Sequence, residues 1–252
     1  MCIRDSAKTG KKVFVTGPAC FLAARAYEQV KVDVAYNRTD VRIIGVSAGV
    51  SYGPLGCTHT TMHDFASMRA LPNLTILAPC DAVQTEYLTD LLCQFTGPVY
   101  MRMGRGDVPP VYEAGEKFEI GKIKTVCEGT DATIIACGEM VAPAKKAAEL
   151  LQAEGISVRV LDCFTIQPMD TKTVEKALRE TRAVVTVEEH STRGGLGEAV
   201  SHIAAELRGS APMRLLGLPE EVVIGKSQEL FAYYGLTPEG ISAAIKERLE
   251  RE

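Results

Sequence analysis

Hydrophobic and polar positions alternate between two patterns along this chain. Short runs rich in aliphatic and β-branched residues recur, such as VRIIGVS at 41–47, and each precedes a longer segment with helical spacing. That order predicts parallel strands joined by helices. In the first half we expect strands over 11–17, 41–47, 74–80 and 98–103, and helices over 20–36, 63–71 and 81–95. Asp81 is the expected N-cap of the last helix, because its carboxylate can accept from free backbone N–H groups.

The second half repeats the alternation after an irregular segment. Residues 104–130 predict a linker with some strand near 118–126. Strands are then expected over 132–138, 158–162, 183–189 and 214–219, and helices over 141–154, 171–180, 228–234 and 238–251. A further helix is expected to open with RGGLGEAV at 193–200. The predicted fold class is α/β with two tandem domains, each a mostly parallel sheet flanked by helices. We place the first domain at 11–106, the linker at 107–130 and the second domain at 131–252.

Composition narrows the possible partners. Of the 252 residues, 46% are hydrophobic and 24% are charged, and the net charge of -4 offers no basic surface for nucleic acid. The apolar runs are far shorter than the about 20 residues of a membrane helix. Eight cysteines without a CxxC motif indicate a reduced, cytoplasmic location and structural roles for these side chains.

The first ten residues, MCIRDSAKTG, show no signal-peptide pattern. The run that follows, KKVFVTG, is typical of a buried strand with no earlier element to pack beside it. We therefore expect the chain to be a fragment or to carry an added leader.

Five segments carry a family resemblance. In order they are PACFLAARAYEQVKVDVAYN, VRIIGVSAGVSYGPLGCTH, MRALPNLTILAPCDAVQTE, PVYMRMGRGDVP and EEHSTRGGLGEAV. The first four resemble the pyrimidine-binding domain of transketolases, and the fifth resembles the C-terminal domain of that family. The likeness runs from about residue 13 to the end of the chain. It is strongest to the smaller, C-terminal subunit of a split transketolase, with an N-terminus that is incomplete.

The resemblance implies a thiamine diphosphate enzyme that moves a two-carbon ketol unit between sugar phosphates. Magnesium and the diphosphate would be bound by a separate N-terminal subunit, and the assembly would be a dimer of heterodimers. The cofactor performs the carbanion chemistry, while the protein holds the aminopyrimidine and excludes water. No metal ligand is expected in this chain.

The resemblance also implies roles for single residues. Phe21 occupies the place of the aromatic residue that stacks on the aminopyrimidine, although a lone Phe is usually a core residue. His59 matches the histidine directed at the sugar near the reactive carbon, where imidazole can move a proton. Arg105 matches the arginine that binds the substrate phosphate, since its planar fork suits a dianion.

Three positions depart from the family pattern. Ser47, expected to contact the substrate, stands where many transketolases have a histidine, and Leu55 replaces an aspartate that reads a donor hydroxyl. Both changes predict a sugar preference different from the standard one. The third departure is the glutamate that activates the cofactor, which the family carries on a helix before the first strand. No residue of this chain matches it, so this polypeptide is not expected to deprotonate the cofactor efficiently as it stands: either the true N-terminus is missing or the subunit is inactive.

Two alternatives stay open at this point. The same scaffold serves the β subunit of 2-oxo acid dehydrogenases and deoxyxylulose phosphate synthase, which would act on pyruvate-like substrates. A non-catalytic subunit that only supports its partner is the third reading. The segment RGGLGEAV could hold an anion at a helix N-terminus, but the resemblance places it away from the chemistry. Glu188, Glu189 and His190 are accordingly expected to be structural or interface residues.

Overall fold

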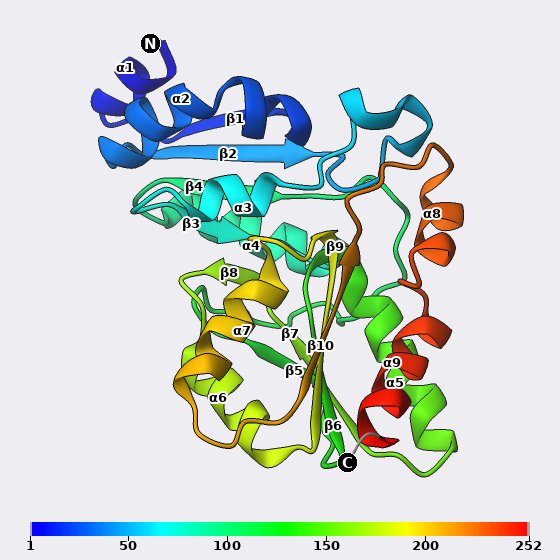
Figure 1. Cartoon of the computed structure of the whole chain (residues 1–252). Helices are drawn as coiled ribbons and strands as arrows, with labels where there is room; N and C mark the ends of the chain where they lie inside the picture. The colour runs from blue at the N-terminus through cyan, green and yellow to red at the C-terminus, as the bar shows by residue number, and fades with distance from the viewer. Residues whose placement is uncertain (1, 251–252) are drawn as a thin grey trace.

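The computed structural model describes residues 2–250 and contains two five-stranded sheets, one above the other in Figure 1. The first sheet has the order β1-β2-β4-β3-β8. Its strands are β1 (Val13–Pro18), β2 (Val41–Val46), β3 (Thr75–Leu77), β4 (Val99–Arg102) and β8 (Thr165–Gln167). All neighbours are parallel except β8, which pairs antiparallel with β3.

The second sheet has the order β10-β9-β6-β7-β5. Its strands are β5 (Lys124–Cys127), β6 (Ala132–Ala136), β7 (Val158–Asp162), β9 (Ala183–Ser191) and β10 (Met213–Leu218). Here only β5 is antiparallel to its neighbour. Every residue of β6 is buried, as expected for a central parallel strand covered on both faces. The predicted fold class of mostly parallel α/β sheets is confirmed.

Most predicted helices are present within one or two residues of the expected positions, and the helix opened by RGGLGEAV begins at Leu196, the fourth residue of that segment. They are α3 (Asp64–Arg69), α4 (Ala82–Gln94), α5 (Val141–Ala153), α6 (Thr171–Glu180), α7 (Leu196–Glu206), α8 (Ser227–Tyr233) and α9 (Pro238–Glu250). Asp81 caps α4 as predicted, since its Oδ1 accepts from the backbone N–H of Gln84 at 2.8 Å. In Figure 1, α6 and α7 lie on one side of the second sheet and α5 and α9 on the other.

The helix expected over residues 20–36 is not a continuous α-helix. Two π-helical segments, η1 (Phe21–Arg25) and η2 (Val30–Tyr36), flank the single turn α2 (Tyr27–Gln29). Valines alternate along η2, and branching at Cβ disfavours regular α-helix in such a run. π-helical turns occur often at functional sites, and Phe21 begins the first of them.

The prediction for the first strand was wrong in one respect. β1 is an edge strand with alternating burial, and Phe14 is 42% exposed. An element also precedes it: α1 (Cys2–Lys8) packs beside β1 and β2 and buries Ala7. Arg4 in α1 donates to Asp33 in η2 at 3.1 Å. The apolar residues of β1 therefore match one covered face, which sequence alone does not distinguish from two.

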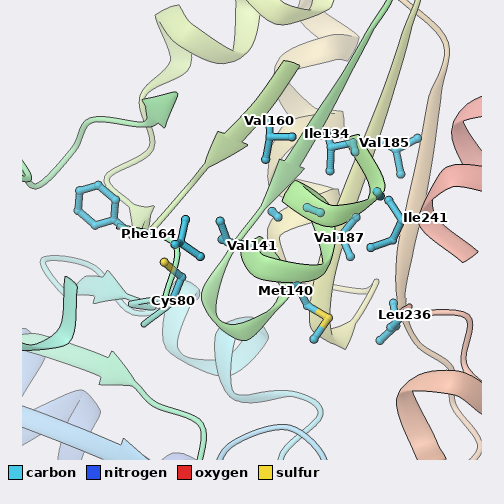
Figure 2. Close-up of a cluster of buried hydrophobic side chains, with 14 of the residues drawn as sticks. Cys80, Ile134, Met140, Val141, Val160, Phe164, Val185, Val187, Leu236 and Ile241 are labelled. Atoms are coloured by element: carbon cyan, nitrogen blue, oxygen red, sulfur yellow. The ribbon is translucent and has the colours of Figure 1, made fainter. Parts of the chain in front are cut away.

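The two halves of the chain share a core. Figure 2 shows Cys80, from the first half, in one buried cluster with Ile134, Met140 and Phe164 from the second. Strand β8 extends this connection, because Gln167 pairs with Ile76 of the first sheet. The domain boundaries given above stay a prediction.

Two further expectations concern the whole chain. Over residues 2–250, no helix has both the length and the apolar character that a bilayer crossing needs. The eight cysteines are free: Cys137 is buried at the end of β6, whereas Cys2, Cys57 and Cys93 are exposed.

Candidate active site

Three neighbouring strands of the first sheet end at one edge. In the β1-β2 register Pro18 pairs with Val46, and in the β2-β4 register Gly45 pairs with Arg102. The segments that leave these strands therefore start side by side, at the carboxyl end where parallel sheets bind ligands. Phe21 follows β1, Ser47 and His59 follow β2, and Arg105 follows β4.

Phe21, His59 and Arg105 are joined through a row of rings. The centroids of Phe21 and His59 are 5.4 Å apart with an edge-to-face angle of 65°. Tyr52 lies 5.8 Å beyond His59, and the guanidinium of Arg105 sits 5.2 Å from the centroid of Tyr52. At the other end, the guanidinium of Arg25 lies 4.0 Å from the Phe21 ring. The structure thus places three of the four predicted site residues on one surface.

Tyr52 and Arg25 were missed by the sequence analysis. Tyr52 lies in the glycine-rich loop between β2 and α3. No periodic pattern there indicates where a tyrosine side chain points. Arg25 occupies the last position of η1, four residues after Phe21, a spacing that brings side chains together on helices. That spacing is the one local signal that could have identified it.

The loop that carries His59 closes on itself. Gly49 and Thr61 exchange backbone hydrogen bonds of 3.2 and 2.8 Å, which return the chain to the strand end. Ser47 and Gly49 take left-handed conformations, with φ of 57° and 61°. Beside the ring, the Thr58 hydroxyl lies 2.9 Å from Nδ1 of His59. When that hydroxyl donates, the proton of the neutral imidazole is on Nε2.

Ser47 is placed differently from the other predicted site residues. Its side chain is only 4% exposed and is not part of the row of rings. Leu55, on the same loop, is 55% exposed. His63 is exposed immediately before α3. The substrate contact predicted for Ser47 stays a prediction.

An open depression of about 690 Å³ lies between the loop of Arg105 and the start of α8. Arg105 lines it from the first half of the chain, and Lys226 lines it from the second. Ser227 donates to the carbonyl of Val50 at 3.0 Å, which holds α8 beside the loop of His59, as Figure 1 shows. Asp107, Glu139 and Glu229 also line the depression, so its lining carries three acidic side chains beside these two cations.

A buried ionic cluster lies at the strand ends that carry the site. Arg102, at the end of β4, donates to Oδ2 of Asp64 at 2.9 Å and to the carbonyl of Glu189 at 2.6 Å. Tyr100 donates to the same Asp64 oxygen at 2.8 Å. Burial lowers the pKa of His190 to about 4, so this ring is neutral near pH 7 and its contact with Asp64 is not an ion pair. The cluster ties α3 to the ends of β4 and β9.

The segment RGGLGEAV has its own carboxylate at the helix start. Glu188 accepts from the backbone N–H groups of Leu196 and Gly197 at 2.7 and 2.8 Å. Burial raises the pKa of Glu188 to about 7, and these two N–H groups oppose that shift. The carboxylate occupies the position that a bound anion would take at the N-terminus of α7.

The chain offers no metal site of its own within residues 2–250, where no three His, Cys, Asp or Glu side chains are grouped to hold an ion. The acidic residue of α1, Asp5, is paired with Arg4 at 2.9 Å, and its side chain is 57% exposed. It lies on the helix before β1, and its carboxylate is paired with Arg4 at the protein surface.

Comparison with known proteins matches both halves of the chain to family models. Residues 6–110 match "Transketolase, pyrimidine binding domain", and residues 121–241 match "Transketolase, C-terminal domain". A relative from Phocaeicola vulgatus, one subunit of an apulose-4-phosphate transketolase, is 49% identical over 97% of this chain and 78% of its own. A "Putative transketolase C-terminal section" from Methanocaldococcus jannaschii is 39% identical over 98% of this chain and 78% of its own.

Solved structures agree with these matches. A "Split gene transketolase, inactive beta4 tetramer" superimposes with a TM-score of 0.89 and 36% identity, covering 99% of this chain and 79% of that one. A transketolase from Pichia stipitis in complex with sedoheptulose 7-phosphate reaches a TM-score of 0.78 over 95% of this chain and 34% of its own. Its 23% identity supports the shared fold.

Proposed function

Since this chain belongs to the transketolase family, we propose that it is the pyrimidine-facing subunit of a split transketolase. It would transfer a two-carbon ketol unit between sugar phosphates after assembly with a diphosphate-binding subunit. The single observation that carries this proposal is the row of rings, because it joins the predicted platform Phe21, the proton carrier His59 and the phosphate-binding Arg105 at one sheet edge.

The residues fit thiamine diphosphate as the cofactor. Phe21 is half-buried, and its ring already attracts the guanidinium of Arg25 at 4.0 Å. An electron-poor heteroaromatic ring such as an aminopyrimidine would stack on this electron-rich face in place of the Arg25 guanidinium. Thiamine diphosphate, when bound, supplies the carbanion chemistry of ketol transfer. Magnesium and the diphosphate would be held by the partner subunit.

His59 is positioned to move protons of the sugar. Its Nδ1 contacts the Thr58 hydroxyl, which leaves Nε2 as the ring nitrogen for the substrate. The imidazole lies between the Phe21 ring and Tyr52, so its plane is set by contacts on both sides. With Nδ1 accepting from Thr58, the neutral imidazole would donate from Nε2 to a ketose oxygen.

Arg105 would bind the phosphate end of the sugar. Its side chain is exposed at the wall of the depression that Lys226 lines from the other side. Its contact with Tyr52 holds the guanidinium on the same row as His59. A sugar phosphate with its reactive end at His59 and its phosphate at Arg105 would lie along this row.

The proposal is tested by mixing the chain with a diphosphate-binding transketolase subunit, thiamine diphosphate and magnesium. Asp5, the acidic residue of α1, is paired with Arg4. A second version of this polypeptide should therefore carry a glutamate-bearing segment before β1, as the family does. We call its assembly with the partner subunit the restored complex. We expect ketol transfer from ketose phosphates by the restored complex and much less by this polypeptide. Turnover of pyruvate alone would favour the 2-oxo acid or deoxyxylulose phosphate reading, and no turnover would favour a supporting subunit.

A further inference from the structure

Glu189 reaches from the second sheet into the loop that carries His59. It lies on β9, is 2% exposed, and its Oε1 accepts from the backbone N–H of Val50 at 2.7 Å. Gly49 makes room for the carboxylate, since a Cβ there would lie 2.1 Å from Cδ of Glu189. With φ of 61°, the backbone at Gly49 also disfavours any side chain. The loop is thus built around this carboxylate.

Glu139 makes the equivalent approach to the loop that carries Arg105. It lies in the short helix η4 (Gly138–Met140), at the end of β6. A Cβ on Gly104 would lie 1.3 Å from Oε1 of Glu139, so a side chain there would displace this carboxylate. Burial raises the pKa of Glu139, whereas Arg102 and the nearby backbone N–H groups of Gly106 and Arg105 favour its ionised form. The carboxylate therefore faces the start of this loop.

The two carboxylates also interact with each other. The negative charge of Glu139 raises the pKa of Glu189, and Arg102 lowers the pKa of both. Asp64 adds a further negative charge next to Glu189. Burial opposes ionisation of both glutamates more strongly than Arg102 favours it. Glu188 caps the N-terminus of α7. Glu189 and Glu139 instead contact the loops that follow β2 and β4.

We propose that Glu189 and Glu139 are positioning residues, with which the second half of the chain holds the loops of His59 and Arg105 at the separation that a bound sugar phosphate requires. This inference rests on the proposed function for the ligand, but the loop contacts themselves do not. It assigns the C-terminal domain a direct part in shaping the site.

Hydrogen exchange of the isolated chain tests the loop contacts without any activity. We expect Glu189→Ala to raise the amide exchange of residues 49–61 about tenfold or more, because the buried hydrogen bond to the backbone of Val50 is lost. Glu139→Ala should raise the exchange of residues 104–108 in the same way. Glu189→Gln should keep the rates near wild type, since the amide oxygen still accepts from Val50. Glu188→Ala is the matched control, and it should loosen the start of α7 instead.

A second measurement separates this inference from the proposed function. In the restored complex, Glu139→Ala should raise KM for the sugar phosphate about tenfold while kcat changes less, because both ends of the ligand lose their fixed spacing. Loop exchange within about twofold of wild type in both alanine variants would overturn the inference, whether or not the complex is active. If Glu189→Ala does not fold, the less deeply buried Glu139 decides the question alone. Loosened loops in an inactive complex would overturn the proposed function and leave the loop contacts established.

Discussion

Asp81 anchors helix α4 and the linker segment at Val111 and Tyr112, so its removal should destabilise the fold. One carboxylate oxygen caps α4 through Gln84, and the other accepts from the backbone N–H groups of Val111 and Tyr112 at 2.8 and 2.9 Å. The side chain is 3% exposed, so water cannot replace it. Loss of a cap costs about 1 kcal/mol, and each buried N–H left without a partner costs about 1–3 kcal/mol. Asp81→Ala should therefore lower the free energy of unfolding by about 3–7 kcal/mol.

Equilibrium urea unfolding measures this loss, and Asp170→Ala provides the matched control. Asp170 caps α6 and also accepts from the backbone N–H of Ile123, but it is partly exposed. Water can take its place, so about 1 kcal/mol should be lost. Asp81→Asn, which keeps one oxygen, should fall between the two. If Asp81→Ala cost no more than Asp170→Ala, burial and the second pair of bonds would not have the weight assigned to them.

Three further predictions concern the site. In the restored complex, His59→Ala should lower kcat by about 10²-fold or more and leave cofactor affinity nearly unchanged; equal losses of both, measured by steady-state kinetics and calorimetry, would indicate a structural role. Arg105→Ala should raise KM for phosphorylated donors about tenfold or more at similar kcat, and an unchanged KM would remove it from the site. Burial raises the pKa of Glu189 from its ordinary value near 4.5 to about 8, so the folded protein holds a proton that the unfolded chain has lost. Stability should fall as pH rises from about 5.5 to about 8, by up to about 1.4 kcal/mol per pH unit for this group; thermal unfolding of Glu189→Gln with an equally steep decline would contradict this assignment.

Local patterns were sufficient for most elements of the fold. The apolar runs and the N-cap Asp81 give the strands and α4 because short-range spacing and capping act within a few residues. The alternating valines of η2 disfavour a regular α-helix, but that the chain takes a π-helical course after Phe21 depends on packing that the sequence does not show. The addition of β8 to the first sheet is equally non-local, since it pairs Gln167 with Ile76.

The site divides in the same way. Phe21, His59 and Arg105 follow neighbouring strand ends, so the topology expected from the sequence already places them at one edge. The contact of Glu189 with Val50 spans 139 positions and leaves no local signal. The sequence analysis interpreted Glu189 as a structural or interface residue and predicted no contacting residue for it. Only the folded chain shows which loop it holds.

The central claim is that this chain supplies the aromatic platform for the cofactor, and cofactor affinity tests it most directly. Calorimetric titration of thiamine diphosphate into the assembled complex should give a dissociation constant raised about tenfold or more by Phe21→Ala, because a stacking face is lost. Phe14, 42% exposed on β1, offers a matched aromatic control. The account predicts unchanged affinity for Phe14→Ala. Equal affinity for wild type, Phe14→Ala and Phe21→Ala would contradict it.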